Sequence, residues 1–452
     1  MPQPTPEQLA EWDRHHVWHA FTQMAEYDPL IFERGQGCTL TDVNGREYLD
    51  GVSSLWCTVH GHRHPRIDAA VRQQLEQVAH TTLLGASNPT TIHLARRLAE
   101  IAPGDLQHVF FSSDGSSAVE VALKLAFQYW RQRKDPRPAK TKYLAFTDAY
   151  HGDTLGSVSV GGVERFHAMF QPLLFDVVRA SAPNPRALPA GLPRDQAAGF
   201  YLEQLRELLR KHHEQLAAIV IEPLVQCAAG MIIHPPGFLR GLADLARNHD
   251  VLLIADEVAT GIGRTGTMFA CEQEGVAPDI LCLGKGLTGG YLPLAATITS
   301  SEVWQAFLGE YAELKTFFHG HTYGGNPLAA AAALATLDLF DEEETLARLQ
   351  PKIVRLGVHL SRLAKHPHVE TRQTGLIAGI ELVKNKAARE PFPWQDRLGW
   401  QVCQDVLDRG VWIRPLGDVL VIMPPLSVSI GELDRILEAV THGIESVTGV
   451  VS

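Results

Sequence analysis

The sequence predicts an α/β protein with a large doubly wound domain, in which the sheet is mainly parallel, and a smaller α+β domain. From about residue 65 to 330, short apolar runs alternate with amphipathic helical patterns, which is typical of parallel strands joined by crossover helices. Beyond residue 330, strand-like runs follow one another before a long helical pattern. We therefore expect an N-terminal segment (1–64) that packs with the small domain, a large domain (65–330) and a C-terminal small domain (331–452).

The elements that precede the alternating region are a hairpin and two helices. Two strand-like runs in GCTLTDVNGREYLDGV (37–52) are joined by Asn44-Gly45, a dipeptide that favours a tight hairpin turn. Apolar residues then recur at helical spacing from residue 67 to 78. A second helix is expected behind Asn88-Pro89-Thr90, because a capping residue and a proline mark a helix start.

The large domain contains six apolar runs with the length of strands. They are HVFFSS, KYLAFT, AAIVIE, VLLIAD, ILCLG and LAATITS, and helical patterns such as AVEVALKLAFQYW and FLRGLADLARNH separate several of them. In the C-terminal domain, GLIAGIELV and VWIRPLGDVLVIMPP are expected as strands and GELDRILEAVTHGIESV as a helix. Because active sites in doubly wound sheets form at the carboxyl ends of the strands, polar residues that follow these runs are candidates.

Composition and charge exclude several classes of protein. The 452 residues carry a net charge of −11, whereas a nucleic-acid-binding protein needs a surplus of cations. The longest uncharged apolar run, Pro327–Leu337, is too short to span a bilayer, and the N-terminus does not resemble a secretory signal. The six cysteines are scattered without C-x-x-C pairs, which suits a reducing compartment and indicates no zinc site. We expect a soluble cytoplasmic enzyme that binds neither nucleic acid nor a membrane.

The stretch LLIADEVATGIGRTG (252–266) contains a formal match to the dinucleotide-binding pattern G-x-G-x-x-G. That fingerprint needs its first glycine at the strand end, a helix opening at the last glycine, and an acid at the end of the next strand. Here the glycines do not directly follow the strand, and Gly275 and Pro278 leave little room for a crossover helix. The sequence therefore argues against a nicotinamide site and leaves Asp256, at the strand end, to be explained.

Lys285 follows the next strand-like run, in ILCLGKGLTGG (280–290). Most lysines are solvated surface residues. This one lies between an apolar strand and several glycines, which let a ligand approach the backbone. In a confined site desolvation disfavours the ammonium form, and the neutral amine forms a Schiff base with an aldehyde. Pyridoxal 5'-phosphate is the aldehyde cofactor that makes such a lysine useful.

Three further features fit that cofactor. Asp256 offers an anion to the pyridine nitrogen, and a charge pair about 4 Å apart is worth roughly 4 kcal/mol at an effective dielectric constant of about 20. Gly115 and Ser116 in SSDGSSAVE open a helix that offers N–H groups to a phosphate, although a plain helix cap explains them equally well. Tyr150 and His151 follow KYLAFT and offer a flat partner for the ring, although an aromatic residue in a loop is often only surface packing.

Several of these motifs are shared with one family. DEVATGIGRTG, GKGLTGG and DGSSAVE resemble the class III aminotransferases of pyridoxal-phosphate fold type I. VWHAFTQM, DGVSSLWCTVHGH, YHGDT, IEPLVQCAAGM, FFHGHTYGGNPLA and GVWIRPLGD are similar to the branch of that family that acts in biotin biosynthesis. The resemblance covers nearly the whole chain. It implies transfer of an amino group from S-adenosylmethionine to 8-amino-7-oxononanoate, giving 7,8-diaminononanoate, in a homodimer with active sites at the subunit interface.

The resemblance also implies a role for each matching residue. Lys285, Asp256 and Tyr150 are expected to be catalytic, with Lys285 attached to the cofactor and shuttling the substrate proton. The cofactor is expected to contact Gly115, Ser116, Tyr150, His151, Gln226, Asp256, Val258 and Lys285 of one subunit and Thr322 donated by the other. The substrates are expected to contact Phe21, Trp56, Tyr150, Asp153, Gly320 and Arg414, with the Arg414 guanidinium gripping the acceptor carboxylate.

Two positions depart from the pattern of this branch. Many members have a Trp-Trp pair where this chain has Leu55-Trp56, and a tyrosine where it has Phe21. The replaced residues help to shape the pocket, so the departures concern the amino donor. FTQM, SSLW, TTLLG and LKTFFHGH are similar to members that use lysine. S-adenosylmethionine is the expected donor, because it is the usual one in the family, and lysine is the alternative.

Three other functions remain to be compared. A broad-specificity omega-amine transaminase would share the fold and cofactor and differ in its acceptor pocket. A non-catalytic binding protein on this scaffold is expected to lack the lysine at position 285, which is present. The histidines of HGHRH (60–64) suggest a metal site, but without a nearby cysteine or paired carboxylates the sequence disfavours it.

Overall fold

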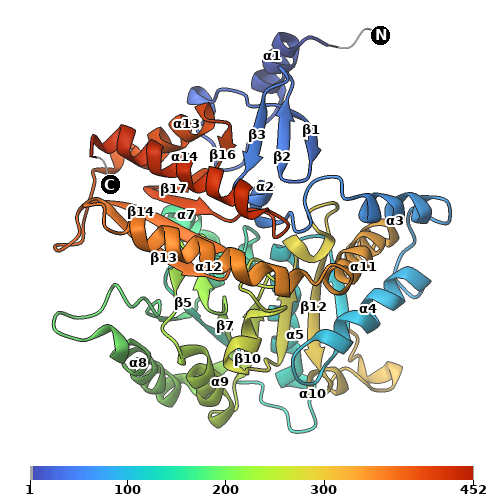
Figure 1. Cartoon of the computed structure of the whole chain (residues 1–452). Helices are drawn as coiled ribbons and strands as arrows, with labels where there is room; N and C mark the ends of the chain where they lie inside the picture. Colours follow the sequence, from blue (N-terminus) through green and yellow to red (C-terminus); the bar gives the residue numbers. More distant parts are fainter. Residues whose placement is uncertain (1–3, 451–452) are drawn as a thin grey trace.

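A seven-stranded sheet lies at the centre of the computed structural model, which describes residues 4–450 (Figure 1). The strand order is β4-β12-β11-β10-β7-β5-β6. In chain order the strands are β4 (Leu106–Ser112), β5 (Lys142–Phe146), β6 (Val178–Ala180), β7 (Leu216–Ile221), β10 (Leu252–Asp256), β11 (Ile280–Leu283) and β12 (Ala295–Ser300). The six expected strands are present, and the short edge strand β6 is an addition to them.

The sheet is mainly parallel, as expected, and β12 is its antiparallel strand. It pairs antiparallel with both β11 and β4, whereas β5, β6, β7, β10 and β11 pair in parallel. A parallel connection needs a crossover of a dozen or more residues, usually with a helix. After β11 the chain makes only the 3₁₀ turn η6 (Lys285–Thr288) and a loop. It therefore returns into the sheet from the edge at which β11 ended.

Both faces of the sheet are buried, because alternate side chains along a strand enter different apolar clusters. Ile254 of β10 packs in the cluster that contains α5 (Gly115–Gln132), whereas Leu253 belongs to the cluster that contains α8 (Ala197–His212) and α9 (Phe238–Asn248). Burial on both faces explains why these strands read as nearly continuous apolar runs. No helix within residues 4–450 is long and apolar enough to cross a membrane.

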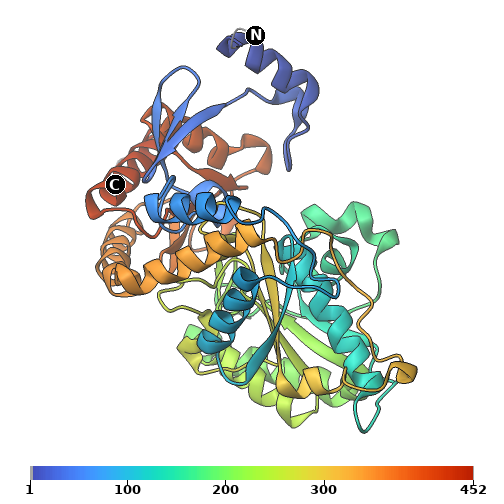
Figure 2. The same cartoon turned by 90° about the vertical axis from the view of Figure 1, so that its right-hand side faces the viewer.

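A group of three helices lies at the β4 edge of the sheet, and one of them contacts β4 directly (Figure 2). The Ala-rich run lies in α11 (Pro327–Glu342), which is largely buried and packs against α3 (Pro65–Leu75) and α4 (Pro89–Ile101). Asn88 caps α4 through the N–H of Thr91, as the start signal predicted. The helical spacing that we extended to residue 78 ends earlier, because α3 stops at Leu75.

The two ends of the chain share one sheet. β1 (Phe32–Gln36), β2 (Thr39–Asp42) and β3 (Glu47–Asp50) are antiparallel, which confirms the hairpin, and β16 (Val411–Trp412) pairs in parallel with β3. The C-terminal part adds β13 (Val369–Thr374), β14 (Ile377–Asn385), β15 (Glu390–Pro391), β17 (Arg414–Leu416) and β18 (Val419–Ile422) with helices α12 (Thr345–Leu363), α13 (Leu398–Asp408) and α14 (Ile430–Thr448). The shorter elements are α1 (Pro6–His16), α2 (Ser53–Trp56), α6 (Leu155–Val160), α7 (Glu164–His167), α10 (Ser301–Gln305), β8 (Val225–Gln226) and β9 (Ile232–Ile233). The domain limits at residues 64 and 330 stay a prediction.

Candidate active site

The carboxyl ends of neighbouring strands bring the candidate residues together. Asp256, the last residue of β10, is level with Cys282 of β11, and the preceding Ala255 is level with Ile221 of β7. Glu222, which follows Ile221, therefore reaches the same edge as Asp256. β11 ends two residues before Lys285, and β5 ends four residues before Tyr150. The parallel register alone thus gathers charged and aromatic side chains from four strands at one edge of the sheet.

These residues line a cavity with a volume of about 480 Å³. The predicted site residues in its wall are Trp56, Gly115, Ser116, Tyr150, His151, Asp153, Asp256, Val258 and Lys285. Five further residues of the wall were not singled out from the sequence: Asp114, Gly152, Thr154, Glu222 and Ala259. Glu222 carried a usable signal, because it is a carboxylate directly behind the apolar run AAIVI. The others belong to loops whose folding follows no simple periodicity.

Asp256 is buried and fixed on both carboxylate oxygens. Its Oδ2 lies 2.7 Å from His151 Nδ1, and its Oδ1 accepts the N–H of Val258 at 3.0 Å. His151 is 3% exposed, and its Nε2 has no hydrogen-bond partner within residues 4–450. The imidazole therefore holds the Asp256 carboxylate in place from one side and leaves its other nitrogen available.

Glu222 ties two loops of the cavity wall together. Its carboxylate accepts the N–H of Tyr150 at 2.9 Å and the N–H of Cys227 at 3.0 Å. Desolvation by burial raises the pKa of Glu222 to about 7, while the neighbouring His151 acts in the opposite direction. A buried carboxyl that stays protonated to near neutral pH limits the negative charge beside Asp256.

Lys285 begins η6 with a left-handed backbone, at a φ of 41°. Its Nζ lies 5.5 Å from the centre of the Trp56 indole ring. The side chain is half-buried in the cavity wall rather than a solvated surface lysine. The amine therefore faces the Trp56 ring in the same cavity wall that contains Asp256 and Glu222.

The N-terminus of α5 forms a second wall, where the helix-cap interpretation of SSDGSS is confirmed and the phosphate site stays a prediction. Asp114 is the helix cap, because its carboxylate accepts the N–H of Ser117 at 2.9 Å. Gly115 and Ser116 are the first residues of the helix and face the cavity. A Cβ on Gly115 would lie 2.4 Å from Val258 Cγ1, so only glycine lets the helix start this close to β10. The first turn of a helix has N–H groups without partners in the helix and binds anions.

Tyr150 lies on the outer side of the cavity in an aromatic group. Its hydroxyl donates to Asp153 Oδ2 at 2.7 Å, and burial raises the pKa of the phenol. Its ring centre is 6.3 Å from that of Phe166, whose ring in turn lies 5.2 Å from Phe21. Phe21 thus reaches the site through Phe166, a residue that the sequence analysis missed because α7 is too short to show a pattern.

Five predicted residues lie outside the cavity wall of this chain. Phe21 is 61% exposed, and Gly320, Thr322 and Arg414 are also exposed. Gln226 is buried, and its Nε2 donates to the carbonyl of Thr147 at 2.8 Å, while its Oε1 has no partner within residues 4–450. Arg414 lies in β17 and not in the central sheet. The roles assigned to these five residues stay predictions.

The structure also bears on two other interpretations of the sequence, the dinucleotide fingerprint and the histidine metal site. GIGRTG forms a turn without a helix: Gly263 and Gly266 have positive φ, and the buried Arg264 donates to the carbonyl of Pro424 at 2.5 Å and to that of Thr58 at 3.1 Å. A dinucleotide fingerprint is therefore ruled out, because the helix that it needs is missing. In HGHRH, His60 bonds the carbonyl of Thr336, His62 bonds Asp50 and His64 bonds Glu343, so each histidine has a separate partner. All six cysteines are free thiols, and only Cys57 is not fully buried.

Comparison with known proteins places the chain among aminotransferases. The family model described as aminotransferase class-III matches residues 22–444. The adenosylmethionine-8-amino-7-oxononanoate aminotransferase of Nitratidesulfovibrio vulgaris is 53% identical over 444 residues, which cover 97% of this chain and 82% of that protein.

Two solved structures extend the comparison. The crystal structure of adenosylmethionine-8-amino-7-oxononanoate aminotransferase from Methanocaldococcus jannaschii has a TM-score of 0.91 at 42% identity, covering 97% of this chain and 99% of that one. The omega transaminase from Pseudomonas jessenii in complex with PMP has a TM-score of 0.93 at 30% identity, covering 98% of each chain. Because the family model matches residues 22–444 and these relatives cover nearly the whole chain, the chain belongs to the class-III aminotransferase family.

Proposed function

We propose that the protein converts 8-amino-7-oxononanoate to 7,8-diaminononanoate with S-adenosylmethionine as the amino donor. The observation that carries the proposal is that Lys285 and Asp256 follow or end adjacent strands and line the same cavity. Together with the helix N-terminus at Gly115, they make a site for pyridoxal 5'-phosphate, the cofactor of the family. The relatives whose names state this reaction, among them the enzyme from Nitratidesulfovibrio vulgaris, support the choice of substrates.

The residues of the cavity fit that cofactor. Gly115 lets the first turn of α5 lie directly against Val258 in the wall, and one buried polar atom of the wall, His151 Nε2, has no partner within residues 4–450. Gly115 and Ser116 would hold the phosphate, and Asp256 the pyridine nitrogen. The two faces of the ring would meet Val258 and Tyr150, while the aldehyde carbon would bond to Lys285, as the family resemblance implies.

The chemistry divides between cofactor and protein. When bound, pyridoxal 5'-phosphate supplies an electron sink for the negative charge that forms on the carbon next to the amine. Lys285 Nζ takes the proton from that carbon and holds it within the cavity. The Asp256 carboxylate is fixed by His151 and by the N–H of Val258, and its negative charge would favour a protonated pyridine nitrogen when the cofactor is bound. Trp56 covers the amine with its indole face and limits access of water.

The substrate side of the proposal uses residues at the rim. Arg414 is exposed on β17 and free to grip the acceptor carboxylate with two hydrogen bonds. Gly320 and Thr322 lie in an exposed loop and do not line the cavity of their own chain. The family resemblance implies that this loop reaches the cavity of a second copy of the chain, and its exposure here supports a homodimer. The free thiols support a cytoplasmic location.

Lysine as the donor is the second candidate, and Phe21 with Leu55 favours it. Phe21 lacks the hydroxyl, and Leu55 lacks the indole, that many members use to shape the donor site. The deciding experiment measures 7,8-diaminononanoate formation from a fixed concentration of 8-amino-7-oxononanoate with either S-adenosylmethionine or lysine. A kcat/KM higher for S-adenosylmethionine supports the proposal. A higher kcat/KM for lysine would show that lysine is the amino donor and would leave the assignment of the acceptor unchanged.

An omega-amine transaminase is the third candidate, because the structural similarity to the Pseudomonas jessenii enzyme is as high as that to the biotin-pathway relative. The same assay, run with pyruvate as acceptor and a simple primary amine as donor, separates the two. Turnover of pyruvate without turnover of 8-amino-7-oxononanoate would overturn the proposal. Because the three candidates share Lys285 and Asp256, they differ only at the rim.

A further inference from the structure

The segment 53–58, which carries Trp56 into the cavity, has an unusual backbone. Ser53, Ser54 and Trp56 have positive φ values of 53°, 62° and 64°. Ser54 combines its φ with a ψ of −84°, which lies outside the regions that residues with a Cβ prefer. Such conformations persist only where the surrounding structure enforces them, and they gather at functional sites. The backbone of segment 53–58 therefore needs neighbouring groups that hold it in this conformation.

Asp50 holds the start of the segment. Its side chain is fully buried, and its carboxylate accepts the N–H of Ser54 at 2.8 Å and that of Val52 at 3.2 Å. His62 Nε2 lies 2.9 Å from the same carboxylate. The amide groups that would otherwise be unpaired in this irregular backbone are thereby satisfied by one acidic side chain.

Arg264 holds both ends of the segment at once. Its guanidinium donates to Ser53 Oγ at 3.3 Å, to the carbonyl of Thr58 at 3.1 Å and to the carbonyl of Pro424 at 2.5 Å. Arg264 is 2% exposed. The Ser53 hydroxyl donates onward to the carbonyl of Met423 at 2.7 Å. The arginine of GIGRTG thus links the turn after β10, the segment 53–58 and the chain that follows β18.

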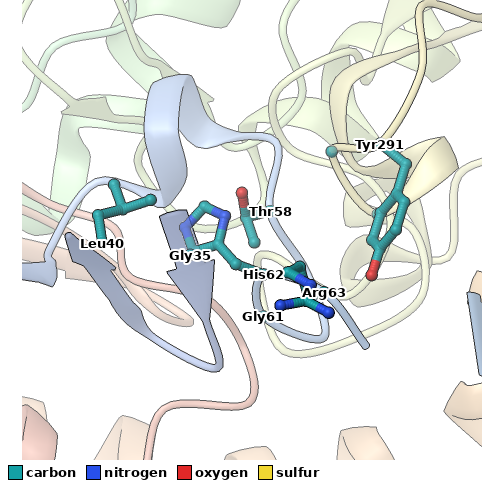
Figure 3. Close-up of a pocket in the computed structure, with 9 residues that line it drawn as sticks. Gly35, Leu40, Thr58, Gly61, His62, Arg63 and Tyr291 are labelled. Carbon is teal, nitrogen blue, oxygen red and sulfur yellow. The ribbon is translucent and has the colours of Figure 1, made fainter. Parts of the chain in front are cut away.

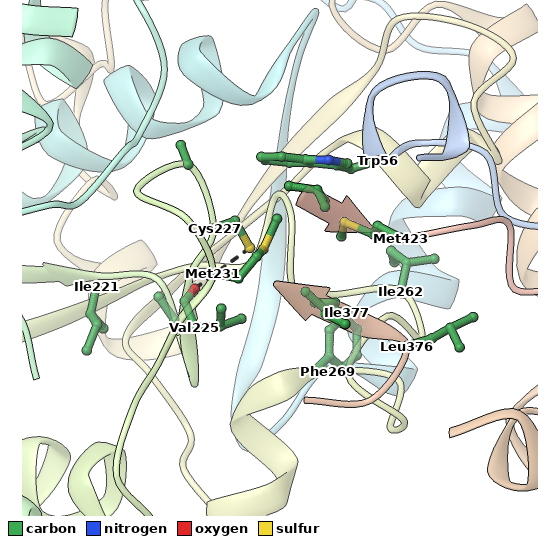
Figure 4. Packing of buried hydrophobic residues seen from close by; sticks show 14 of the residues in the cluster. Trp56, Ile221, Val225, Cys227, Met231, Ile262, Phe269, Leu376, Ile377 and Met423 are labelled. Atoms are coloured by element: carbon green, nitrogen blue, oxygen red, sulfur yellow. Dashed lines mark hydrogen bonds between the residues drawn. The ribbon is translucent and has the colours of Figure 1, made fainter. Parts of the chain in front are cut away.

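Segment 53–58 lies beside two cavities, which explains why it needs the hydrogen bonds of Asp50 and Arg264. Trp56 faces the active-site cavity, and Figure 4 shows its indole above the buried cluster that contains Ile262 and Met423. Thr58 and His62 line a second cavity of about 180 Å³ (Figure 3). The segment is therefore a thin wall between two cavities, and close packing alone does not fix it there.

We propose that Arg264 and Asp50 are positioning residues for the substrate site. They hold segment 53–58 in its strained conformation, so that the Trp56 indole stays over Lys285 and against the bound substrate. The inference rests on the proposed function only for the identity of that substrate. If it is right, loosening the segment weakens substrate binding, because the wall is less often in place. Cofactor binding, which uses Gly115, Ser116 and Asp256, is unchanged.

The test compares Arg264→Lys with Ser53→Ala. In Arg264→Lys the charge is kept, but a single ammonium nitrogen cannot reach all three acceptors of the guanidinium. In Ser53→Ala only one of these acceptors, the Ser53 hydroxyl, is lost. We expect KM for both substrates to rise by about tenfold or more in Arg264→Lys and by about threefold in Ser53→Ala, with cofactor affinity, followed by absorbance titration, within about twofold. Amide hydrogen exchange of residues 52–59 in the holoenzyme should accelerate in the same order.

Arg179→Lys is the matched control, because Arg179 donates to the carbonyl of Val160 at 2.9 Å near the far edge strand β6 and touches none of these groups. It should leave KM and the exchange of residues 52–59 unchanged. Unchanged exchange of residues 52–59 in Arg264→Lys would overturn the proposal, and so would faster exchange with unaltered KM. Because exchange does not depend on turnover, a wrong donor or acceptor assignment would appear in the substrate assay and not in this one.

Discussion

The floor and the rim of the active-site cavity are built in different ways. At the floor, Asp256, His151 and Glu222 are buried, and their side chains accept or share hydrogen bonds with neighbouring loops of the same chain. At the rim, Phe21 and Arg414 are exposed, and both belong to parts of the chain outside the central sheet. The floor is therefore buried and internally bonded, whereas the rim is open to solvent.

This difference indicates that the floor determines the rate of the chemical step and that the rim determines substrate binding. Charges at the floor act in a desolvated site, where their interactions are strong, so substitutions there should change the rate of the chemical step. Groups at the rim meet solvent and the variable part of the substrate, so substitutions there should change KM or the choice of donor. The following predictions test this division.

Lys285→Ala should have the largest effect. Without the amine, nothing at the floor attaches the cofactor or moves the substrate proton, and a positioned acid–base group contributes about 100- to 10,000-fold to a rate. We expect kcat to fall by about a thousandfold or more, and borohydride treatment to leave no cofactor mass on the protein. Lys140→Ala is a suitable control, since that buried lysine donates to three main-chain carbonyls far from the cavity and its loss should affect stability rather than attachment. Retained colour and activity in Lys285→Ala would overturn the role of Lys285.

Asp256→Asn should have the next largest effect on the rate. The substitution removes the negative charge but keeps the shape of the side chain, including an oxygen for the N–H of Val258. Loss of an interaction worth up to about 4 kcal/mol corresponds to a fall in kcat of up to about a thousandfold. Single-turnover kinetics of the donor half-reaction measure it. Asp256→Glu, which keeps the charge, should retain more activity than Asp256→Asn; the reverse order would show that geometry, and not charge, matters at this position.

The same division separates what the sequence could and could not predict. Asp256, Lys285 and Gly115 sit next to regular strands or a helix, so periodicity and the parallel arrangement were enough to place them at one edge. β12 was predicted as a strand but its antiparallel direction was not, because a strand pattern does not carry direction; the short link 284–294 is the feature that requires it. Phe166 and the backbone of segment 53–58 were also missed. Their positions depend on contacts between residues far apart in sequence, such as Arg264 with Thr58, which no local pattern encodes.

Arg414→Ala should act on binding at the rim. A charge-assisted hydrogen bond is worth about 1.5–3 kcal/mol, so losing the guanidinium should raise KM for 8-amino-7-oxononanoate by about 10- to 100-fold. KM for the donor and the rate of the donor half-reaction should change by less than about threefold. Steady-state kinetics with each substrate varied in turn distinguish these effects. Arg414→Lys should recover part of the loss. Equal increases in KM for both substrates would contradict the assignment of Arg414 to the acceptor carboxylate.

The free energy of unfolding should also depend on pH through a buried carboxyl at the floor, whereas the exposed residues of the rim should add no such dependence. Burial raises the pKa of Glu222 to about 7, whereas an exposed glutamate titrates near 4.5. Between these values the folded protein keeps a proton that the unfolded chain has released, so stability falls as pH rises through this window. Glu222 alone should lower the free energy of unfolding by about 2 kcal/mol between pH 5 and pH 7, and Glu222→Gln should remove that part of the slope.

Urea unfolding of the wild type and of Glu222→Gln at both pH values measures this slope, and Glu257→Gln is the matched control. Glu257 is equally buried, accepts the N–H groups of Ala270 and Cys271, and has its pKa raised to about 7 by the same desolvation, but it does not line the cavity. Both variants should flatten the pH dependence of stability to a similar degree. Only Glu222→Gln should also alter kcat, because only Glu222 holds the N–H of Tyr150 and lies beside Asp256. An equal effect of both variants on kcat would show that the floor acts through overall stability and not through the placement of its charges.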